Sequence, residues 1–493
     1  MVETFSVLDA PVTLKSDLAS EFPLYLYVLE GSKAVLYSDS ISDLLSDLRI
    51  RKPLKICSEG VSFLLQSGVV PPPKTVFEGV YVIGIGDEAH LSARSNQVDV
   101  FFSHNYPFLN RYRPPVGSMD PDFDTVLEML ATATSSRLDH GRDSYLFHSA
   151  GKDSNTIALA LAEAGWQDKV SLITHKSKGS SDESELSARI AKRLGFKHKV
   201  LKEVEVLSHS GQQEATSYFK DTLLPCTDTV SMAYPLYLQQ LPGLRGSNII
   251  DGGGNDSYMM IPPTKKEKFF LSFSKLMQYG ASARGQLRSE SVAMPLTRTP
   301  AEWCGANGFS YSDSKKIFPS SVDVLDYWRG ASRVKSELDD VDFKTSVLAP
   351  VVASELHIRK VRIFAEAVGS RLVLPFSNEK CARYFSKMPE SYLFDKKSSR
   401  NKLILRDLLK DRLSLDSDKI GKMGFSYDSR SFVINNWEWM QSHIYACDVW
   451  DKAGVDEVIP RLRISMYGKG WSAGAAGRLL YRIFLLSIFF NTR

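Results

Sequence analysis

The sequence predicts an α/β protein with a short N-terminal β-rich domain followed by a domain built on a doubly wound parallel sheet. Residues 1–110 alternate short β-rich runs with turn residues, and residues 111–122 (RYRPPVGSMDPD) are rich in Pro, Gly and Asp. From residue 123 onward, apolar strand-like runs alternate with segments of helical period. Because such alternation calls for a parallel sheet covered by helices, we expect domains at 1–110 and 123–493, joined by the linker 111–122.

The N-terminal region has the pattern of an antiparallel sheet. Its β-rich runs are separated by turn residues, among them the triple proline Pro71–Pro73. The expected strands are Leu24–Val28, Ala34–Tyr37, Gly79–Ile85 and Val98–Phe102. Short strands divided by turn residues are typical of antiparallel sheets, in which neighbouring strands are joined by tight connections.

The second region begins with a helical pattern at Phe123–Arg137. An apolar strand at Ser144–His148 follows it. The next expected elements are helix Asn155–Ala164, strand Val170–Thr174, helix Glu183–Leu194 and strand Lys199–Leu201. The remainder is expected to be mostly helical. Its most apolar segment, Leu479–Phe490, is short and contains Arg482, so it predicts a buried helix rather than a membrane span.

Composition narrows the possible classes of protein. The 493 residues are 43% hydrophobic and 24% charged, as in soluble globular proteins, and the net charge of +4 is too small to argue for nucleic acid. The five cysteines form no CxxC pair, and the N-terminus has no signal-peptide core. We therefore expect a cytoplasmic protein without a nucleic-acid or membrane partner. The oligomeric state stays open, with a homodimer as one possibility.

The segment Ser149–Ser154 (SAGKDS) lies between a predicted strand and a predicted helix. A tight turn of small residues at a helix N-terminus binds anions through its backbone N–H groups. Ser149 and Ser154 add hydroxyl donors, and Gly151 allows a phosphate to approach the backbone closely. A carboxylate beside phosphate is repelled unless it holds a cation, so Asp153 is expected to bind Mg²⁺. The alternative is an ordinary strand–turn–helix junction with a Ser or Asp cap.

A second glycine-rich segment, Asp251–Asp256 (DGGGND), follows the apolar residues Ile249–Ile250. Ligands of doubly wound sheets bind at the carboxyl ends of the strands, so Asp153 and Asp256 can converge there. The alternative is that the segment is only a glycine-rich turn.

The SAGKDS segment resembles the SGGxDS pyrophosphate loop of the asparagine synthetase-like ATP pyrophosphatases, with Ala150 in place of the first glycine and Lys152 at the variable position. Further segments resemble this family in the required order. They are Ser184–Gly195 with Glu185 at the acidic position, Asp251–Asp256, Leu374–Phe376 with Arg400–Arg406, and Lys419–Phe425 with Lys422 at the catalytic lysine. Gly68–Val80 resembles the end of the family's N-terminal amidotransferase domain, so the resemblance covers roughly 60–490.

The resemblance implies a PP-loop synthetase domain at 123–493 and an Ntn-like amidotransferase domain at 1–110. It implies ATP and Mg²⁺ as cofactors, with Asp153 and Asp256 holding the metal and Lys422 stabilising charge that develops during the reaction. The implied ATP and pyrophosphate contacts are Ser149, Ala150, Gly151, Lys152, Asp153, Ser154, Thr174, Gly252 and Lys402. The implied reaction activates the carboxylate of a small, amino-acid-like molecule as its acyl-adenylate and joins it to an amine.

Departures from the family pattern narrow this expectation. Val2 stands where glutamine-using members expose a cysteine, so the N-terminal domain is expected to be glutaminase-dead. Gly253 stands where other members carry a carboxylate or a tyrosine, and Glu290 falls near the position of the glutamate in the Tyr–Glu dyad of β-lactam synthetases. We expect an amine of the substrate itself to attack, as in β-lactam synthetases of natural-product biosynthesis. The alternatives are an intermolecular amide ligase, a peptide macrolactam cyclase, and an inactive scaffold homologue.

Overall fold

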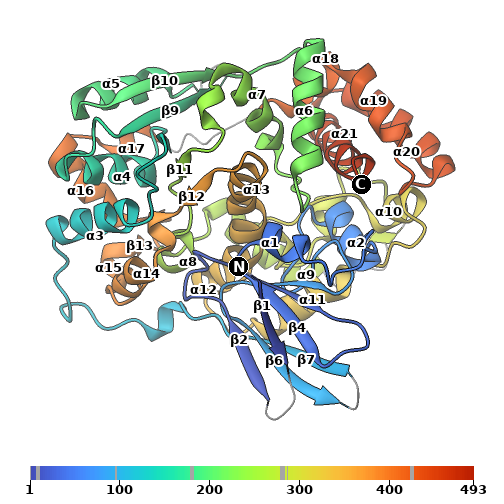
Figure 1. The fold of residues 1–493 in the computed structure, drawn as a ribbon, viewed down its shortest axis with the longest axis horizontal. Helices are drawn as coiled ribbons and strands as arrows, with labels where there is room; N and C mark the ends of the chain where they lie inside the picture. Colours follow the sequence, from blue (N-terminus) through green and yellow to red (C-terminus); the bar gives the residue numbers. More distant parts are fainter. Residues whose placement is uncertain are drawn as a thin grey trace.

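Strands occur in two regions of the chain, an antiparallel region near the N-terminus and a parallel sheet farther along, as Figure 1 shows. The computed structural model describes residues 2–6, 11–94, 97–177, 182–277, 284–285, 287–421 and 427–493. The architecture is mixed α/β, which confirms the fold class expected at this level.

The N-terminal region forms two antiparallel sheets. In the first, the strands β1 (Glu3–Ser6), β4 (Ala34–Ser38), β3 (Leu24–Val28) and β5 (Val80–Ile83) are paired in that order. In the second, the order is β2 (Val12–Lys15), β6 (Asp87–Arg94) and β7 (Gln97–His104). The four predicted runs all lie on strands, and α1 (Ile41–Ser46) and α2 (Ser58–Gln66) accompany them.

The two faces of the first sheet are both buried. Leu26 of β3 packs in an apolar cluster with Ala89 and Leu91 of the second sheet. The neighbouring Tyr25 belongs instead to the large core that includes helices of the C-terminal region. This division follows from the two-residue period of a strand, which sends successive side chains to opposite faces.

The second region is built on a five-stranded parallel sheet. Its order is β10 (Lys197–Lys202), β9 (Val170–Lys176), β8 (Ser144–Phe147), β11 (Asn248–Ile250) and β12 (Arg371–Val373). The parallel sheet is confirmed, whereas β12 was not expected as a strand because three residues carry too short a pattern. From β8 the chain runs outward through β9 and β10, then returns to β11 on the other side of β8, so the strand order reverses between β8 and β11.

Helices cover both faces of the parallel sheet. Ile250 of β11 packs in a cluster with residues of α3 (Phe123–Ser135) and α4 (Lys152–Glu163). Its neighbour Ile249 lies in the other cluster, with residues of α6 (His209–Asp221), α7 (Ala233–Gln240) and α13 (Arg359–Ala367). Helix α5 (Ser184–Leu194) follows β9 and contributes to the first face.

The rest of the described chain is mostly helical, as expected. Further elements are α8 (Asp256–Met259), α9 (Lys265–Met277), α10 (Tyr311–Ile317), α11 (Leu325–Val334), α12 (Asp340–Leu348), the π-helical η8 (Ala349–Ile358), α14 (Glu379–Ser386), α15 (Glu390–Leu393), α16 (Leu403–Leu413), α17 (Ser417–Ile420), α18 (Ser429–Asn435), α19 (Trp437–Tyr445) and α20 (Lys452–Met466). Two short strands, β13 (Phe394–Asp395) and β14 (Arg400–Asn401), form a separate antiparallel pair.

The last helix, α21 (Gly470–Asn491), is long and apolar enough to cross a membrane by length and composition, yet 89% of its most apolar window is buried inside the protein. Arg482, which interrupts the apolar run, donates to the backbone carbonyl of Asn307. Phe489 lies against Phe77 of the N-terminal region, with ring centroids 6.4 Å apart. The observed burial and the contact with Phe77 both indicate a core helix, which is what the sequence predicted.

The segment 111–122 connects the two regions with irregular backbone after the short helix η1 (Asn110–Tyr112). Arg113 within it donates hydrogen bonds to the backbone carbonyls of Phe385, Ser386 and Tyr258. The connection is therefore anchored on the second region and differs from a linker that runs free in solvent.

Candidate functional site

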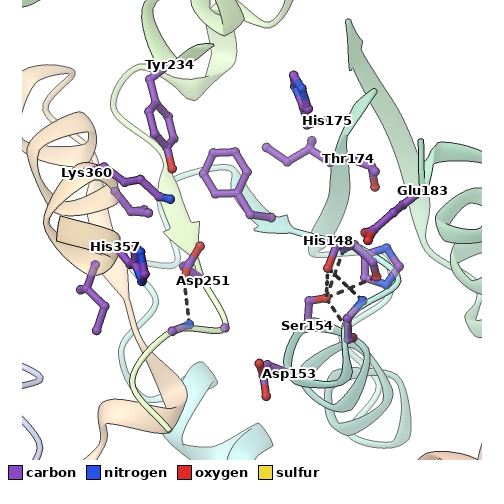
Figure 2. Close-up of a pocket in the computed structure, with 18 of the residues that line it drawn as sticks. His148, Asp153, Ser154, Thr174, His175, Glu183, Tyr234, Asp251, His357 and Lys360 are labelled. Carbon is purple, nitrogen blue, oxygen red and sulfur yellow. Dashed lines mark hydrogen bonds between the residues drawn. The ribbon is translucent and has the colours of Figure 1, made fainter. Parts of the chain in front are cut away.

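A cavity of about 270 Å³ lies at the carboxyl ends of β8, β9 and β11 (Figure 2). One wall comes from the loop after β8 and the start of α4, with Ser149 and Ser154. The opposite wall carries Tyr234 of α7, His357 of η8 and Lys360 of α13. The reversal of strand order between β8 and β11 places this cavity where doubly wound sheets bind their ligands.

The loop after β8 is held by its own two serines. The hydroxyl of Ser149 accepts from the backbone N–H of Gly151 at 3.0 Å, and that of Ser154 accepts from the backbone N–H of Ser149 at 3.1 Å. The two hydroxyl oxygens are 3.2 Å apart. These bonds fix a tight turn directly before α4.

Helix α4 begins at Lys152, three residues earlier than expected, so Asp153 and Ser154 lie in its first turn. Its N-cap is Gly151, which has no side chain to satisfy the first N–H groups of the helix. The predicted alternative, a Ser or Asp side-chain cap, is therefore wrong. A helix N-terminus left open in this way carries partial positive charge and suits an anionic ligand.

Asp153 and Asp256 converge, as the strand positions predicted, and they meet at Lys402. The Lys402 ammonium lies 2.7 Å from Asp153 Oδ2 and 2.9 Å from Asp256 Oδ1. Burial alone would lower the pKa of Lys402, but the two carboxylates raise it above its ordinary value, so the side chain stays charged. The structure thus brings together three of the predicted site residues from α4, α8 and the start of α16.

The carboxylate pair fits the coordination chemistry of Mg²⁺. Within the described ranges no group of three or more His, Cys, Asp and Glu side chains is arranged to hold a metal ion. Mg²⁺, however, is usually held by one or two carboxylates together with phosphate oxygens and water. The side chains of Asp153 and Asp256 keep 28% and 40% of their surface exposed, and Asp153 Oδ1 accepts the side-chain N–H of Asn255 at 2.6 Å.

The glycines after β11 are required by close contacts rather than by a simple turn. A Cβ on Gly252 would lie 3.1 Å from Asp153 Cβ and 3.2 Å from the backbone nitrogen of Ser154. Gly254 has φ +110°, and a Cβ there would lie 2.1 Å from the hydroxyl of Ser377. Gly252 therefore allows the segment after β11 to pack directly against the first turn of α4.

This packing leads to a prediction for Gly252→Ala. The added methyl group pushes the two loops apart, so we expect about 1–3 kcal/mol lower stability. Denaturant unfolding measures this loss. Gly330→Ala on α11 is the matched control, because a Cβ there meets nothing within 4 Å. Equal behaviour of both variants would contradict the role given to Gly252.

Two buried side chains lie at the base of the wall that the loop after β8 forms. Thr174 of β9 is 2% exposed, and its hydroxyl lies 2.9 Å from His198 Nε2. His148 Nε2 lies 2.9 Å from the side-chain oxygen of Asn155. Burial lowers the pKa of His148 to about 4, so the ring is neutral near pH 7 and donates this bond. Both residues line the cavity, and His148 supports the loop through Asn155, which donates to the backbone carbonyls of Ser149 and Gly151.

The acidic residue near the loop is Glu183, whereas the family resemblance pointed to Glu185. Glu183 accepts the backbone N–H of Ala150 at 2.8 Å, and burial raises its pKa. Glu185 is exposed on α5. The signal for Glu183 was its place immediately before the helix, as the N-cap residue of α5.

Sequence reasoning missed the opposite wall. Asp251, directly after β11, accepts the backbone N–H of Gly253 at 2.8 Å. Lys360 lies across the cavity from the loop that carries Ser149 and Ser154, and its ammonium is 3.3 Å from Asp228 Oδ2. Figure 2 shows Asp251, Lys360 and Tyr234 facing the wall formed by Ser154 and Asp153. Lys360 and Tyr234 belong to no predicted motif, and Asp251 had no role assigned within the DGGGND segment, so only the tertiary structure brings the three together.

Two predicted catalytic residues are not placed at the cavity. Glu290 is buried elsewhere, 3.2 Å from the guanidinium of Arg461, which also binds Asp313 at 2.7 Å. It does not line the cavity, because this ion-pair cluster with α20 holds it. Lys422 lies outside the described residues. Val2 is partly buried against the large core.

No family model matches the sequence, and no curated protein matches it. The function is therefore inferred from the cavity and from the motifs that line it.

Proposed function

We propose that this protein is an ATP- and Mg²⁺-dependent amide-forming synthetase similar to the asparagine synthetase-like ATP pyrophosphatases. The observation that carries the proposal is the meeting of two sequence-distant loops, SAGKDS and DGGGND, at one edge of the parallel sheet. Their carboxylates, Asp153 and Asp256, share one cationic partner beside an open helix N-terminus. An anion site next to paired carboxylates is what a nucleoside triphosphate with its metal requires.

Each candidate residue has a role in this proposal. The loop Ser149–Ser154 takes the pyrophosphate that leaves when a substrate carboxylate attacks the α-phosphorus of ATP. Asp153 and Asp256 would hold Mg²⁺, which supplies charge neutralisation on the phosphates. Lys402 keeps the two carboxylates in place. From its resemblance to the family's catalytic lysine, Lys422 stabilises the charge that develops when an amine displaces AMP.

The source of the amine distinguishes the versions of this proposal. We propose that an amine of the substrate itself closes the new amide bond, as in β-lactam synthetases. An intermolecular amide ligase and a peptide macrolactam cyclase differ only in this second step. The N-terminal antiparallel region is proposed to be a degenerate amidotransferase domain that no longer supplies ammonia.

The experiment that tests the proposal is trapping of the acyl-adenylate. The protein is incubated with ATP, Mg²⁺ and hydroxylamine, together with each of the proteinogenic amino acids, the diamino acids and short peptides. We expect an amino-acid hydroxamate by mass spectrometry, with AMP and pyrophosphate released in equal amounts. Release of ADP and phosphate instead, or no hydroxamate from any of these acids, would reject an adenylating synthetase.

A second expected result concerns glutamine. Because Val2 replaces the thiol that attacks the glutamine amide, we expect no release of labelled glutamate from labelled glutamine above background. The measurement is made with and without ATP, since synthetase activity could influence a coupled glutaminase. A glutamine-dependent amide product would contradict the proposed inactivity of the N-terminal region.

A further inference from the structure

The second half of the proposed reaction needs a base for the attacking amine. The position that carries a carboxylate or a tyrosine in similar synthetases is Gly253, which has no side chain. Glu290, the other expected carboxylate, lies in an ion-pair cluster with Arg461 and does not line the cavity. The group that accepts the proton must therefore come from another part of the cavity.

The lack of a side chain at Gly253 has a direct structural counterpart in Asp251. Asp251 Oδ1 accepts the backbone N–H of Gly253 at 2.8 Å. A Cβ on Gly253 would lie only 3.1 Å from that same oxygen and 3.2 Å from Ile358 Cγ1. A larger residue at 253 would thus crowd the carboxylate of Asp251, whereas glycine leaves this position open for it.

Asp251 lies on the wall opposite the phosphate loop. It follows β11 directly and lines the cavity together with Lys360 of α13 and Tyr234 of α7, and Asp153 of α4 lines the other side. Burial raises the pKa of Asp251, the N–H of Gly253 and the charge of Lys360 lower it, and the charge of Asp153 raises it, with a net increase. A carboxylate whose affinity for protons is increased suits general-base catalysis near neutral pH.

Of the other acid–base groups on the cavity wall, Glu183 and His148 are engaged on the phosphate side, whereas His357 and Tyr234 share the wall of Asp251. Glu183 accepts the N–H of Ala150 in the phosphate loop. His148 lies against Asn155 of α4, where it supports the same loop. Asp251 is the carboxylate on the wall where a substrate would sit.

We propose that Asp251 is the general base that deprotonates the attacking ammonium group of the substrate, an inference that rests on the proposed synthetase function. One proton passes from the substrate ammonium to Asp251 Oδ, and the freed electron pair of the nitrogen forms a bond to the acyl carbon of the adenylate. The bond from that carbon to the phosphate oxygen breaks, and its electron pair leaves with AMP. The second proton of the nitrogen passes to water.

Two nucleophiles separate this role from adenylation. Hydroxylamine is unprotonated at neutral pH and needs no base, whereas methylammonium must lose a proton before it attacks. Both are offered to the wild-type protein and to Asp251→Asn, with ATP, Mg²⁺ and the amino acid that gives the strongest hydroxamate signal. We expect Asp251→Asn to form hydroxamate within about threefold of the wild-type rate and to lose at least about a hundredfold in methylamide formation.

Further variants test chemical function against structural disturbance. Glu366→Gln is the matched control, because Glu366 also has a raised pKa, about 7 through burial, yet does not line the cavity. It should leave both rates unchanged. Added formate should restore part of the methylamide formation of Asp251→Ala, since a small carboxylate can occupy the vacated space and accept the proton.

The pH dependence gives an independent measurement. A base must be deprotonated to act, so methylamide formation by the wild-type protein should fall as pH falls through the raised pKa of Asp251. Hydroxamate formation, expressed per unprotonated hydroxylamine, should lack this limb. Equal losses of both products in Asp251→Asn, without formate rescue of Asp251→Ala, would overturn the base assignment and make Asp251 a binding residue. Undiminished methylamide formation would overturn it as well. A wild-type protein that forms no hydroxamate would instead overturn the proposed function on which the inference rests.

Discussion

Asp153→Asn and Asp256→Asn are each expected to lower acyl-adenylate formation by roughly a hundred- to a thousandfold, or about 3–4 kcal/mol of transition-state stabilisation. The two carboxylates come from separate loops and meet at a single cation beside an open helix N-terminus. In the proposed reaction, removing one negative charge weakens the binding of Mg²⁺ at the position where pyrophosphate leaves. ATP–pyrophosphate exchange at limiting Mg²⁺ measures the loss.

The control for this pair is Asp168→Asn, a charge change of the same kind at an exposed position between α4 and β9. It should exchange at the wild-type rate, and circular dichroism should show all three variants folded. Near-normal exchange in both Asp153→Asn and Asp256→Asn would show that the carboxylates share no catalytic metal.

Lys402→Met is expected to lower the free energy of unfolding by about 2–3 kcal/mol. Its side chain is 7% exposed and its ammonium neutralises two carboxylates, so its removal leaves two like charges facing each other. Breaking a fully buried pair in this way costs about 3–5 kcal/mol, and the partial exposure of the aspartates reduces that value. The left-handed backbone at Lys402, with φ +57°, is equally strained with methionine, so the comparison isolates the charge.

A double-mutant cycle makes the reason for this loss measurable. If charge repulsion is the cause, adding Asp153→Asn to Lys402→Met should restore part of the lost stability, as measured by urea unfolding. Added Mg²⁺ should also raise the melting temperature of Lys402→Met more than that of the wild type, because the ion replaces the missing ammonium. A double variant less stable than either single variant would exclude this electrostatic explanation.

Local patterns were sufficient to predict the framework of the site. The apolar strand before Ser149, the small residues of the loop and the helix after it lie within a few neighbouring residues, so their order alone predicts the element types. The strand ends before Asp153 and Asp256 also predicted correctly that these two carboxylates would meet. Strand β12 escaped prediction because three residues are too few to display a period.

The remaining site residues depend on how distant segments approach one another. Lys402 was expected at the site, but its contact with Asp153 spans 249 positions of sequence, and no local pattern predicts that contact. Glu183 and Glu185 differ by two residues in sequence, yet only the tertiary contact with Ala150 identifies the first as the one beside the loop. Asp251 looked like part of a glycine-rich turn until the contacts of Gly253 with it were known.

The contact between Phe77 and Phe489 of α21 has a consequence for synthesis on the ribosome. More than four hundred residues separate these partners, which at about 5–20 residues per second corresponds to a delay of roughly 20–80 s. During that delay the nascent N-terminal sheets lack the helix that later completes their apolar core. Newly made chains therefore pass through a long period in which chaperones compete with aggregation, and the yield of native protein depends on how rapidly the last helix arrives.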